Sequence, residues 1–333
     1  RIWIAASKLE TDPKRRKTVL RKALLNISNS AILWKAAIEL EEPEDAKIML
    51  LRATECVEDD VDLWLALARL SSYENAKKVL NRAIRKLPAE KRIWIAAAQL
   101  QEANDNLGLV GDIITRAVEA LATHNINISR VDWLKTAEVC EKEGSIDTCQ
   151  TIVMKTIALG LEKEDQKRTW IEDAEMCIAR RSICTARAIY AYATSVYNKK
   201  KSLWLRMADL ERQEGCKDKL ISVLQTAVEN CPGADILWLM LAKEQWLGGD
   251  ITAALETLKN AFKAIPTCEE IWLAAVKLEK ETGRFDKARL VLTNARKQAN
   301  SKRVWMKSAM LERSLKNYEE EGNLLDEGIR NFP

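Results

Sequence analysis

The sequence predicts an all-α fold, a right-handed solenoid of about ten helical hairpins. Only 11 glycines and 6 prolines occur among 333 residues, and these are the residues that most often interrupt helices. Tryptophan also recurs regularly, at spacings of 30 to 39 residues. A period of this length is typical of stacked helical hairpins, since one hairpin cannot bury its apolar face without a neighbour.

Ten of the eleven tryptophans form this ladder, and we expect them to be the structural core. They are Trp3, Trp34, Trp64, Trp94, Trp133, Trp170, Trp204, Trp238, Trp272 and Trp305. We expect residues 1–333 to form a single continuous array, an internal fragment of a longer protein. Its units should start near residues 1, 31, 61, 91, 130, 167, 201, 235, 269 and 302.

The first helix of each unit should carry its tryptophan on a buried stripe. A small residue usually follows four positions later and a leucine six positions later, as in Trp204, Ala208 and Leu210. Positions i, i+4 and i+7 share one helix face, so an apolar residue at +6 or +7 should complete the stripe. Eleven residues after the tryptophan the helix should end, often at a glycine that can adopt a left-handed conformation. These glycines are Gly144, Gly215, Gly249 and Gly283.

The second helix of each unit should carry two alanines seven positions apart. The pairs are Ala46/Ala53, Ala76/Ala83, Ala186/Ala193, Ala254/Ala261 and Ala288/Ala295. Two turns apart, the alanines share a stripe that packs on the first helix. Proline often follows five residues later and should end the helix. We expect differences in unit length to fall only in the turns.

Several functional classes are disfavoured by composition. No apolar stretch approaches the roughly 20 residues that cross a bilayer, so we expect no membrane association. The eight cysteines contain no C-x-x-C pair and His124 is the single histidine, so we expect no metal site. No glycine-rich phosphate-binding run occurs either. We therefore expect no cofactor, no small-molecule substrate and no enzymatic activity.

The repeats resemble the half-a-TPR (HAT) repeat. Its signature is a tryptophan and a Leu-Glu pair in the first helix, with an Ala-Arg segment in the second. Matches include "LWKAAIELE" (33–41), "LWLRMADLE" (203–211), "IWLAAVKLE" (271–279) and "ARAIYAYA" (186–193). Tetratricopeptide repeats are the neighbouring possibility, but the tryptophan ladder favours HAT repeats.

Within HAT proteins, the chain resembles the pre-mRNA-processing factor 6 family. The resemblance is carried by "LWLMLAKEQWLGGDITAA" (237–254), "EEIWLAAVKLEKE" (269–281), "TWIEDAEMC" (169–177) and "RVWMKSAMLE" (303–312). It implies a splicing scaffold in the nucleus that bridges the parts of the spliceosomal tri-snRNP. It also implies other spliceosomal snRNP proteins as partners, with RNA contact that is indirect or weak. The alternative is a subunit of another RNA-processing complex, crooked-neck-like or of 3′-end cleavage, with direct RNA contact.

The candidate partner-binding residues are Trp246 and the cluster Lys199, Lys200 and Lys201. Trp246 lies eight residues after Trp238, where eight of the other nine units are polar. It should widen the apolar face toward a neighbouring unit or else serve as an exposed anchor for a partner. The lysines fall near a turn between units, where stacking could align them with Lys302 and Arg303 along one edge and attract phosphates. The alternative is a solvated surface, balanced by acidic residues elsewhere.

Overall fold

The computed structural model describes residues 2–126 and 128–332, and the predicted all-α fold is confirmed. The described residues form twenty α-helices and no strand. Contacts divide the chain into two compact units, one up to Ile189 and one from Tyr190. Arg1 and Pro333, at the ends of the expected array, lie outside the described residues.

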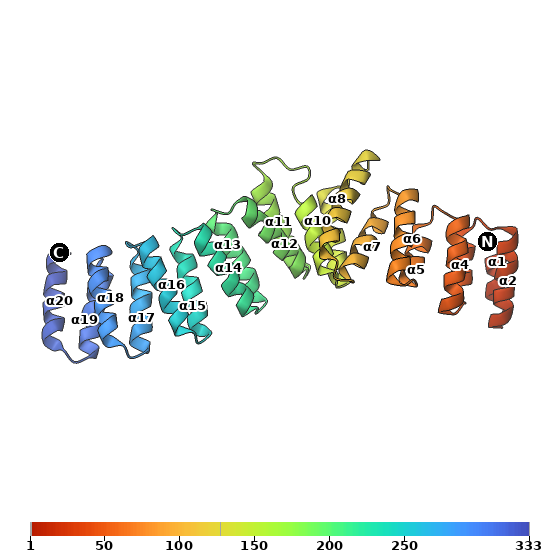
Figure 1. The fold of residues 1–333 in the computed structure, drawn as a ribbon. Coiled ribbons are helices and arrows are strands. Elements are labelled where there is room, and N and C mark those ends of the chain that lie inside the picture. Colours follow the sequence, from red (N-terminus) through yellow and green to blue (C-terminus); the bar gives the residue numbers. More distant parts are fainter. Residues whose placement is uncertain (1, 127, 333) are drawn as a thin grey trace. The chain divides into compact units, whose positions relative to one another are not determined.

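The first unit is a series of antiparallel helix pairs (Figure 1). The helices are α1 (Ile2–Leu9), α2 (Pro13–Asn26), α3 (Ala31–Ile38), α4 (Pro43–Cys56), α5 (Val61–Arg69), α6 (Tyr73–Lys86), α7 (Lys91–Glu102), α8 (Leu107–Thr123), α9 (Arg130–Lys142), α10 (Ile146–Thr156) and α11 (Gln166–Ala179). The boundary with the second unit falls inside α12 (Ile183–Val196).

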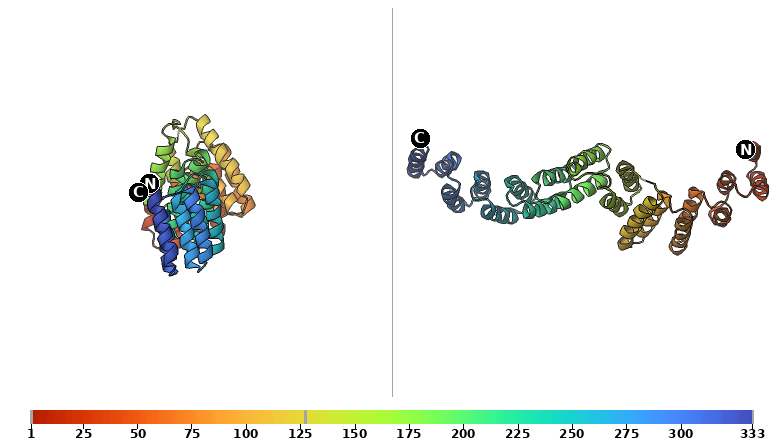
Figure 2. Two further views of the ribbon diagram at one scale, coloured as in Figure 1. Left: turned by 90° about the vertical axis from the view of Figure 1, so that its left-hand side faces the viewer. Right: turned by 90° about the horizontal axis from the view of Figure 1, so that it is seen from above.

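The second unit continues the same alternation of first and second helices. Its helices after α12 are α13 (Lys201–Gln213), α14 (Lys217–Asn230), α15 (Asp235–Leu247), α16 (Ile251–Ala264), α17 (Glu269–Glu281), α18 (Phe285–Gln298), α19 (Lys302–Ser314) and α20 (Tyr318–Asn331). From above, the helices toward the C-terminus, α16 to α20, are seen nearly end-on and alternate between two rows (Figure 2). First helices also touch directly, since α15 contacts α17 and α17 contacts α19.

The alanine pairs of the second helices lie where helices pack most tightly. Ala53, Ala83, Ala193, Ala261 and Ala295 have no exposed surface, and their partners seven residues earlier are also buried. Because alanine is small, it lets the backbone of the adjoining helix approach closely. Leu258 and Leu292, which follow the first alanine of their pairs, fill the remaining space.

Most tryptophans of the ladder are buried, and their indole N–H groups have a second role. Trp34, Trp64, Trp94, Trp133, Trp170, Trp204 and Trp272 are buried, whereas Trp3, Trp238 and Trp305 are half-buried. In six units the indole Nε1 donates to the carbonyl oxygen six residues earlier, over 2.7 to 3.0 Å. This acceptor lies in the turn that joins one hairpin to the next, so the tryptophan holds that turn while it fills the core. We call this bond the indole clasp.

The proline that follows the second helix takes part in the indole clasp. Pro88, Pro232 and Pro266 supply the carbonyl oxygens that accept from Trp94, Trp238 and Trp272 respectively. Proline therefore ends the helix, as expected, and its own carbonyl is then satisfied by the next repeat.

The position eleven residues after the tryptophan has a left-handed conformation in seven units. Gly144, Gly215, Gly249 and Gly283 have φ between +73° and +90°. Asp105, Arg181 and Lys316 stand at the same position with φ of 57°, 62° and 61°. The turn thus requires a positive φ even where the chain supplies a residue with a Cβ, which costs about 1 kcal/mol.

The expectation that unit length varies only in the turns is wrong. The first helices α1, α3 and α5 have 8, 8 and 9 residues, whereas the later first helices have 12 to 14. The difference is about one helical turn of 3.6 residues, so its removal keeps the buried stripe in phase.

The expected burial of leucine at position +6 is also only partly met. Leu210, Leu278 and Leu311 are buried in the second unit, but Leu9 and Leu70 of the shortened helices are exposed. In these short helices the position falls at or beyond the last helical turn, where it no longer faces the core.

The indole clasp leads to a stability prediction at Trp272, which stacks on Phe262 with ring centroids 3.9 Å apart. Trp272→Ala should lower the free energy of unfolding by about 3–5 kcal/mol, as for other buried aromatics. Trp272→Phe keeps a ring but leaves the Pro266 carbonyl without its donor, so it should cost about 1–2 kcal/mol. Urea denaturation measures both. Trp246→Phe is the control because no hydrogen bond from its indole occurs among the described residues; equal losses for the two Phe variants would contradict the clasp.

The left-handed turns lead to a second prediction. Lys316→Gly should raise the free energy of unfolding by about 0.5 kcal/mol, because relief of backbone strain outweighs the added entropy of the unfolded chain. Gly283→Ala should lower it by about 1 kcal/mol through φ alone, since a Cβ there meets no atom within 4 Å. Thermal unfolding of both variants and of the parent chain measures whether each substitution raises or lowers the free energy of unfolding. A Gly283→Ala chain that is more stable than the parent would contradict the prediction.

Candidate interaction surfaces

The position seven residues after the tryptophan is buried and polar in six of the units. The sequence pattern predicts an apolar residue at position +6 or +7, and it does not predict a buried polar side chain at +7. The buried polar side chains at this position are Glu41, Gln101, Glu211, Gln245, Glu279 and Glu312. A buried carboxylate is unfavourable unless it is paired, so each of these side chains needs a partner.

The partners of two of these carboxylates come from the preceding hairpin. Glu312 on α19 accepts two bonds of 2.8 Å from the Arg289 guanidinium of α18. Glu41 accepts from Lys17 and Arg21 of α2, each over 2.9 Å. The hydrogen bonds from Arg289 and from Lys17 lower the pKa values of Glu312 and Glu41 below the ordinary 4.5. These ion pairs join successive hairpins across the stack.

Two further glutamates cap helices of the next hairpin. The Glu102 carboxylate of α7 accepts from the backbone N–H groups of Asp147 and Thr148 and from the Thr148 hydroxyl, over 2.6 to 2.9 Å. Glu141 of α9 does the same for Cys184 and Thr185, over 2.6 to 2.9 Å. The N–H groups of a helix's first turn have no acceptor within the helix, so a carboxylate there stabilises it. Glu41, Glu102, Glu141 and Glu312 therefore all join one hairpin to another.

Trp246 is half-buried and packs toward the following hairpin. It lies against the apolar cluster of Leu258, Ile271 and Leu278, from α16 and α17. The Lys277 ammonium lies 5.2 Å from its ring centroid, within the range of a cation–π contact. The apolar face of α15 is therefore extended toward the neighbouring unit, one of the two arrangements expected from the sequence.

A groove opens beside Trp246 between α15 and α17. Its volume is about 260 Å³. Leu239, Ala242, Leu258, Ala274 and Leu278 form its apolar lining together with the indole, and Lys243, Lys277 and Glu281 stand at its rim. Trp246 is thus a wall of a surface groove as well as part of the packing between hairpins.

The first unit has a larger groove across α5, α7 and α9, with a volume of about 650 Å³. Leu65, Ile95 and Val139 line it, and charged groups of both signs surround it. Three of those groups are already engaged, since Arg92 pairs with Asp62 over 2.9 Å and Lys135 with Asp132 over 3.5 Å. Its lining contains four basic residues, Arg69, Lys91, Arg92 and Lys135, and two acidic residues, Asp132 and Glu143.

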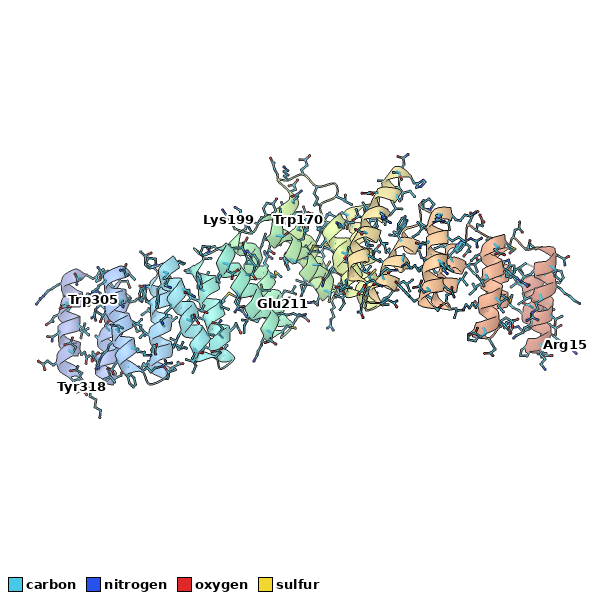
Figure 3. The ribbon with its side chains drawn as sticks, in the orientation of Figure 1. Arg15, Trp170, Lys199, Glu211, Trp305 and Tyr318 are labelled. Carbon is cyan, nitrogen blue, oxygen red and sulfur yellow. The ribbon has the colours of Figure 1, made fainter. Side chains whose placement is uncertain are left out.

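Lys199, Lys200 and Lys201 are exposed at the turn between α12 and α13. Figure 3 shows Lys199 at the upper edge of the second unit, where hairpins are joined, and Tyr318 at its lower edge. The next two turns on the upper edge, 231–234 and 265–268, contain no basic residue. At the last turn on this edge, Arg303 pairs with Glu269 and Glu270. The structure thus does not bring these cations into a continuous basic stripe.

The cysteines and other metal-binding side chains are dispersed. Within residues 2–126 and 128–332, no three His, Cys, Asp or Glu side chains come together as a metal site would require. Burial raises the pKa values of the Cys140, Cys149 and Cys177 thiols to about 12. A thiol in this state is a poor nucleophile.

Among the described residues, none of the helices combines the length and apolarity needed to cross a bilayer.

Comparisons with known proteins reveal close relatives. A tetratricopeptide-repeat family model matches residues 246–311. The chain is 55% identical over 208 residues to "Pre-mRNA-processing factor 6" of Homo sapiens, covering 62% of this chain and 22% of that protein. It is 50% identical over 234 residues to "Protein STABILIZED1" of Arabidopsis thaliana, covering 70% of this chain and 23% of the relative.

A more distant relative has a similar name. The chain is 42% identical over 130 residues to "Pre-mRNA-splicing factor prp1" of Schizosaccharomyces pombe, covering 39% of this chain and 14% of that protein. The match thus spans less than a quarter of the length of each of these three relatives.

The buried carboxylates lead to a prediction about pH. The pKa of Glu312 is lower in the folded state than its ordinary value, so its contribution is present above about pH 4.5 and is lost as the pH falls through the folded pKa. Glu312→Gln should lower the free energy of unfolding at pH 7 by about 2 kcal/mol, because the charge-assisted bonds to Arg289 are lost. Its profile between about pH 5 and 3 should also be flatter. Urea midpoints across pH measure this, with exposed Glu319→Gln as control. Parallel profiles for parent and Glu312→Gln would contradict the assignment.

Proposed function

This chain belongs to the pre-mRNA-processing factor 6 family, and we propose that it acts in pre-mRNA splicing as a platform for protein–protein interactions. The observation that carries the proposal is 55% identity to a human protein named for pre-mRNA processing. The shared segment is less than a quarter of that protein. The proposal therefore concerns the repeat array.

The contacts that hold the hairpins together and the grooves on the first helices support the proposal of a binding platform. Tryptophans, alanines and the polar residues at position +7 hold the hairpins together. The outward sides of the first helices carry grooves in both units. We propose that the ten units form one continuous array, starting near the residues expected above, which presents these surfaces in series.

We propose further that the chain is not an enzyme. The buried thiols with raised pKa values are unsuited to nucleophilic attack. Several carboxylates that would be candidates for acid–base chemistry are instead paired with arginine or with helix N-termini. His124 is exposed at the end of α8, without a hydrogen-bonded partner of its side chain among the described residues.

The partners that fit this role are other spliceosomal snRNP proteins, and the site of action is the nucleus. Bridging of the tri-snRNP is the specific task that we propose. Direct RNA binding is the second candidate, because Lys199, Lys200 and Lys201 are exposed together. The lack of basic residues at the next two turns favours protein partners.

The test is affinity purification from nuclear extract with the tagged 333-residue chain. We expect spliceosomal snRNP proteins to co-purify, with the small nuclear RNAs of the tri-snRNP following only as long as those proteins do. Ribonuclease treatment should leave the bound proteins in place. Recovery of 3′-end cleavage components instead, or nanomolar binding of bare RNA at near-physiological salt, would overturn the proposal.

A further inference from the structure

The first helices of the second unit share an outward surface whose basic side chains are exposed and whose apolar side chains are partly buried or exposed. At about 100° per residue, positions 1, 2, 5, 8 and 9 after each tryptophan cover an arc of about 120° opposite the buried stripe. We call these positions of α13, α15, α17 and α19 the second-unit face.

The second-unit face combines cationic and apolar side chains. Its seven basic residues, all exposed, are Arg206, Arg212, Lys243, Lys277, Lys280, Lys307 and Arg313. Its apolar residues are Leu205, Leu239, Met240, Trp246, Leu247, Leu273, Ala274, Met306 and Met310. Only Asp209 and Glu281 are acidic. This surface is therefore strongly basic in a chain whose net charge is only +4.

The same five positions differ in the first unit. There they hold eight acidic and five basic residues after the six tryptophans from Trp3 to Trp170. The basic surface is therefore a property of the second unit and does not follow from the repeat pattern.

Three cations of the second-unit face have no partner among residues 2–126 and 128–332. Lys243, Lys280 and Lys307 make no hydrogen bond or ion pair among the residues that the structure describes. By contrast, Arg313 pairs with Glu321 over 2.7 Å, and Arg212 pairs with Asp209 over 3.1 Å. The unpaired lysines lie on three successive first helices, so a partner crossing the helices would meet one on each.

The groove beside Trp246 lies within this face. It is apolar inside, with Leu239, Ala274 and Leu278 on its walls, and Lys243 and Lys277 stand at its rim. A volume of about 260 Å³ can admit one or two aliphatic side chains. Exposed Met306 and Met310 continue the apolar surface onto α19, and methionine adapts readily to a partner's shape.

We propose that the second-unit face binds an acidic amphipathic helix of a partner protein. An aliphatic side chain of that helix enters the groove beside Trp246, and its carboxylates meet Lys243, Lys277 and Lys307. Packed helices lie 8–10 Å apart, so α15 to α19 span roughly 20 Å, the length of a helix of about 14 residues. The inference rests on the proposed function as an interaction platform and specifies its partner.

The contacts favour a protein over RNA. Lys277 lies over the ring of Trp246, so that face of the indole is not open to a nucleotide base. The interior of the groove is lined by leucine, alanine and the Trp246 indole, and its charged groups stand at the rim, which suits an aliphatic side chain better than a base edge. Alternation of aliphatic surface with lysine instead matches a helix whose leucine side chains are flanked by glutamate.

The test measures the binding of three fluorescein-labelled helical peptides to the 333-residue chain by anisotropy. Each peptide has about 16 residues, enough to cross the three helices. The first has a leucine face flanked by glutamates, the second replaces leucine by alanine, and the third replaces glutamate by glutamine. The Lys243→Glu/Lys307→Glu chain removes two unpaired cations. Its matched control is Lys259→Glu/Lys297→Glu, at exposed lysines of α16 and α18.

We expect saturable binding of the first peptide that weakens as salt rises. The parent chain should bind the second and third peptides at least about tenfold more weakly than the first. The Lys243→Glu/Lys307→Glu chain should bind the first peptide at least about tenfold more weakly than the parent chain does. The Lys259→Glu/Lys297→Glu control should stay within about twofold. All substitutions are at exposed positions, and circular dichroism verifies that each chain is folded.

Several outcomes would overturn the inference. No binding of the first peptide up to about 100 μM, or equal binding of all three peptides, would remove the proposed partner. If the chain binds a single-stranded oligouridine more tightly than the first peptide, and the Lys243→Glu/Lys307→Glu chain loses that binding, the face is assigned to RNA. Self-association in sedimentation that this variant abolishes would assign it to a second copy of the chain.

Nuclear-extract purification separates this inference from the proposed function. If splicing proteins co-purify with the parent chain but the peptides do not bind, only the acidic-helix inference fails. If splicing proteins do not co-purify at all, the proposed function fails, whatever the peptides do.

Discussion

The indole clasp is the interaction on which the rest of the structure depends. A tryptophan on each first helix fills the space between two helices, and in six units its N–H fixes the turn that leads into its own hairpin. Leucine or phenylalanine could fill a comparable space but could not donate this bond. In these six units a side chain inside the repeat therefore ties the first helix to the turn that precedes it, which favours tryptophan over other apolar residues there.

The polar residue at position +7 complements the clasp from the other end of the first helix. Glu312, at position +7, binds Arg289 of the preceding hairpin, and Glu102, at the adjacent position +8, caps a helix of the following one. Because these contacts use buried charge, they demand correct geometry and thereby favour a single register of stacking. The exposed lysines Lys243, Lys280 and Lys307, on the outward face of the first helices, take no part in these contacts. In the second unit this face is basic and apolar, and it is there that we place a partner.

The helical repeat and its turns could be predicted from the sequence because they depend on spacing. The glycines at 144, 215, 249 and 283 have the expected left-handed conformation. The polar role of position +7 was missed, although glutamate recurs there at Glu41, Glu211, Glu279 and Glu312 and could have signalled it. Three things could not be read from spacing. The shortening of α1, α3 and α5 removes one helical turn and preserves phase. The direction in which the Trp246 side chain lies depends on its packing against α17. The net charge of a surface shared by several helices can be counted only once it is known which helices lie next to each other.

Exchange of the tryptophan indole protons tests the central claim most directly. In the chain labelled with ¹⁵N-tryptophan, hydrogen–deuterium exchange can be followed for each indole N–H by nuclear magnetic resonance. The account predicts slow exchange for the clasped indoles of Trp34, Trp64, Trp94, Trp204, Trp238 and Trp272, and rapid exchange for Trp246. The contrast should persist for Trp238 and Trp246, which are both half-buried on α15. Equal exchange rates for these two indoles would contradict the clasp as the bond that holds successive hairpins together.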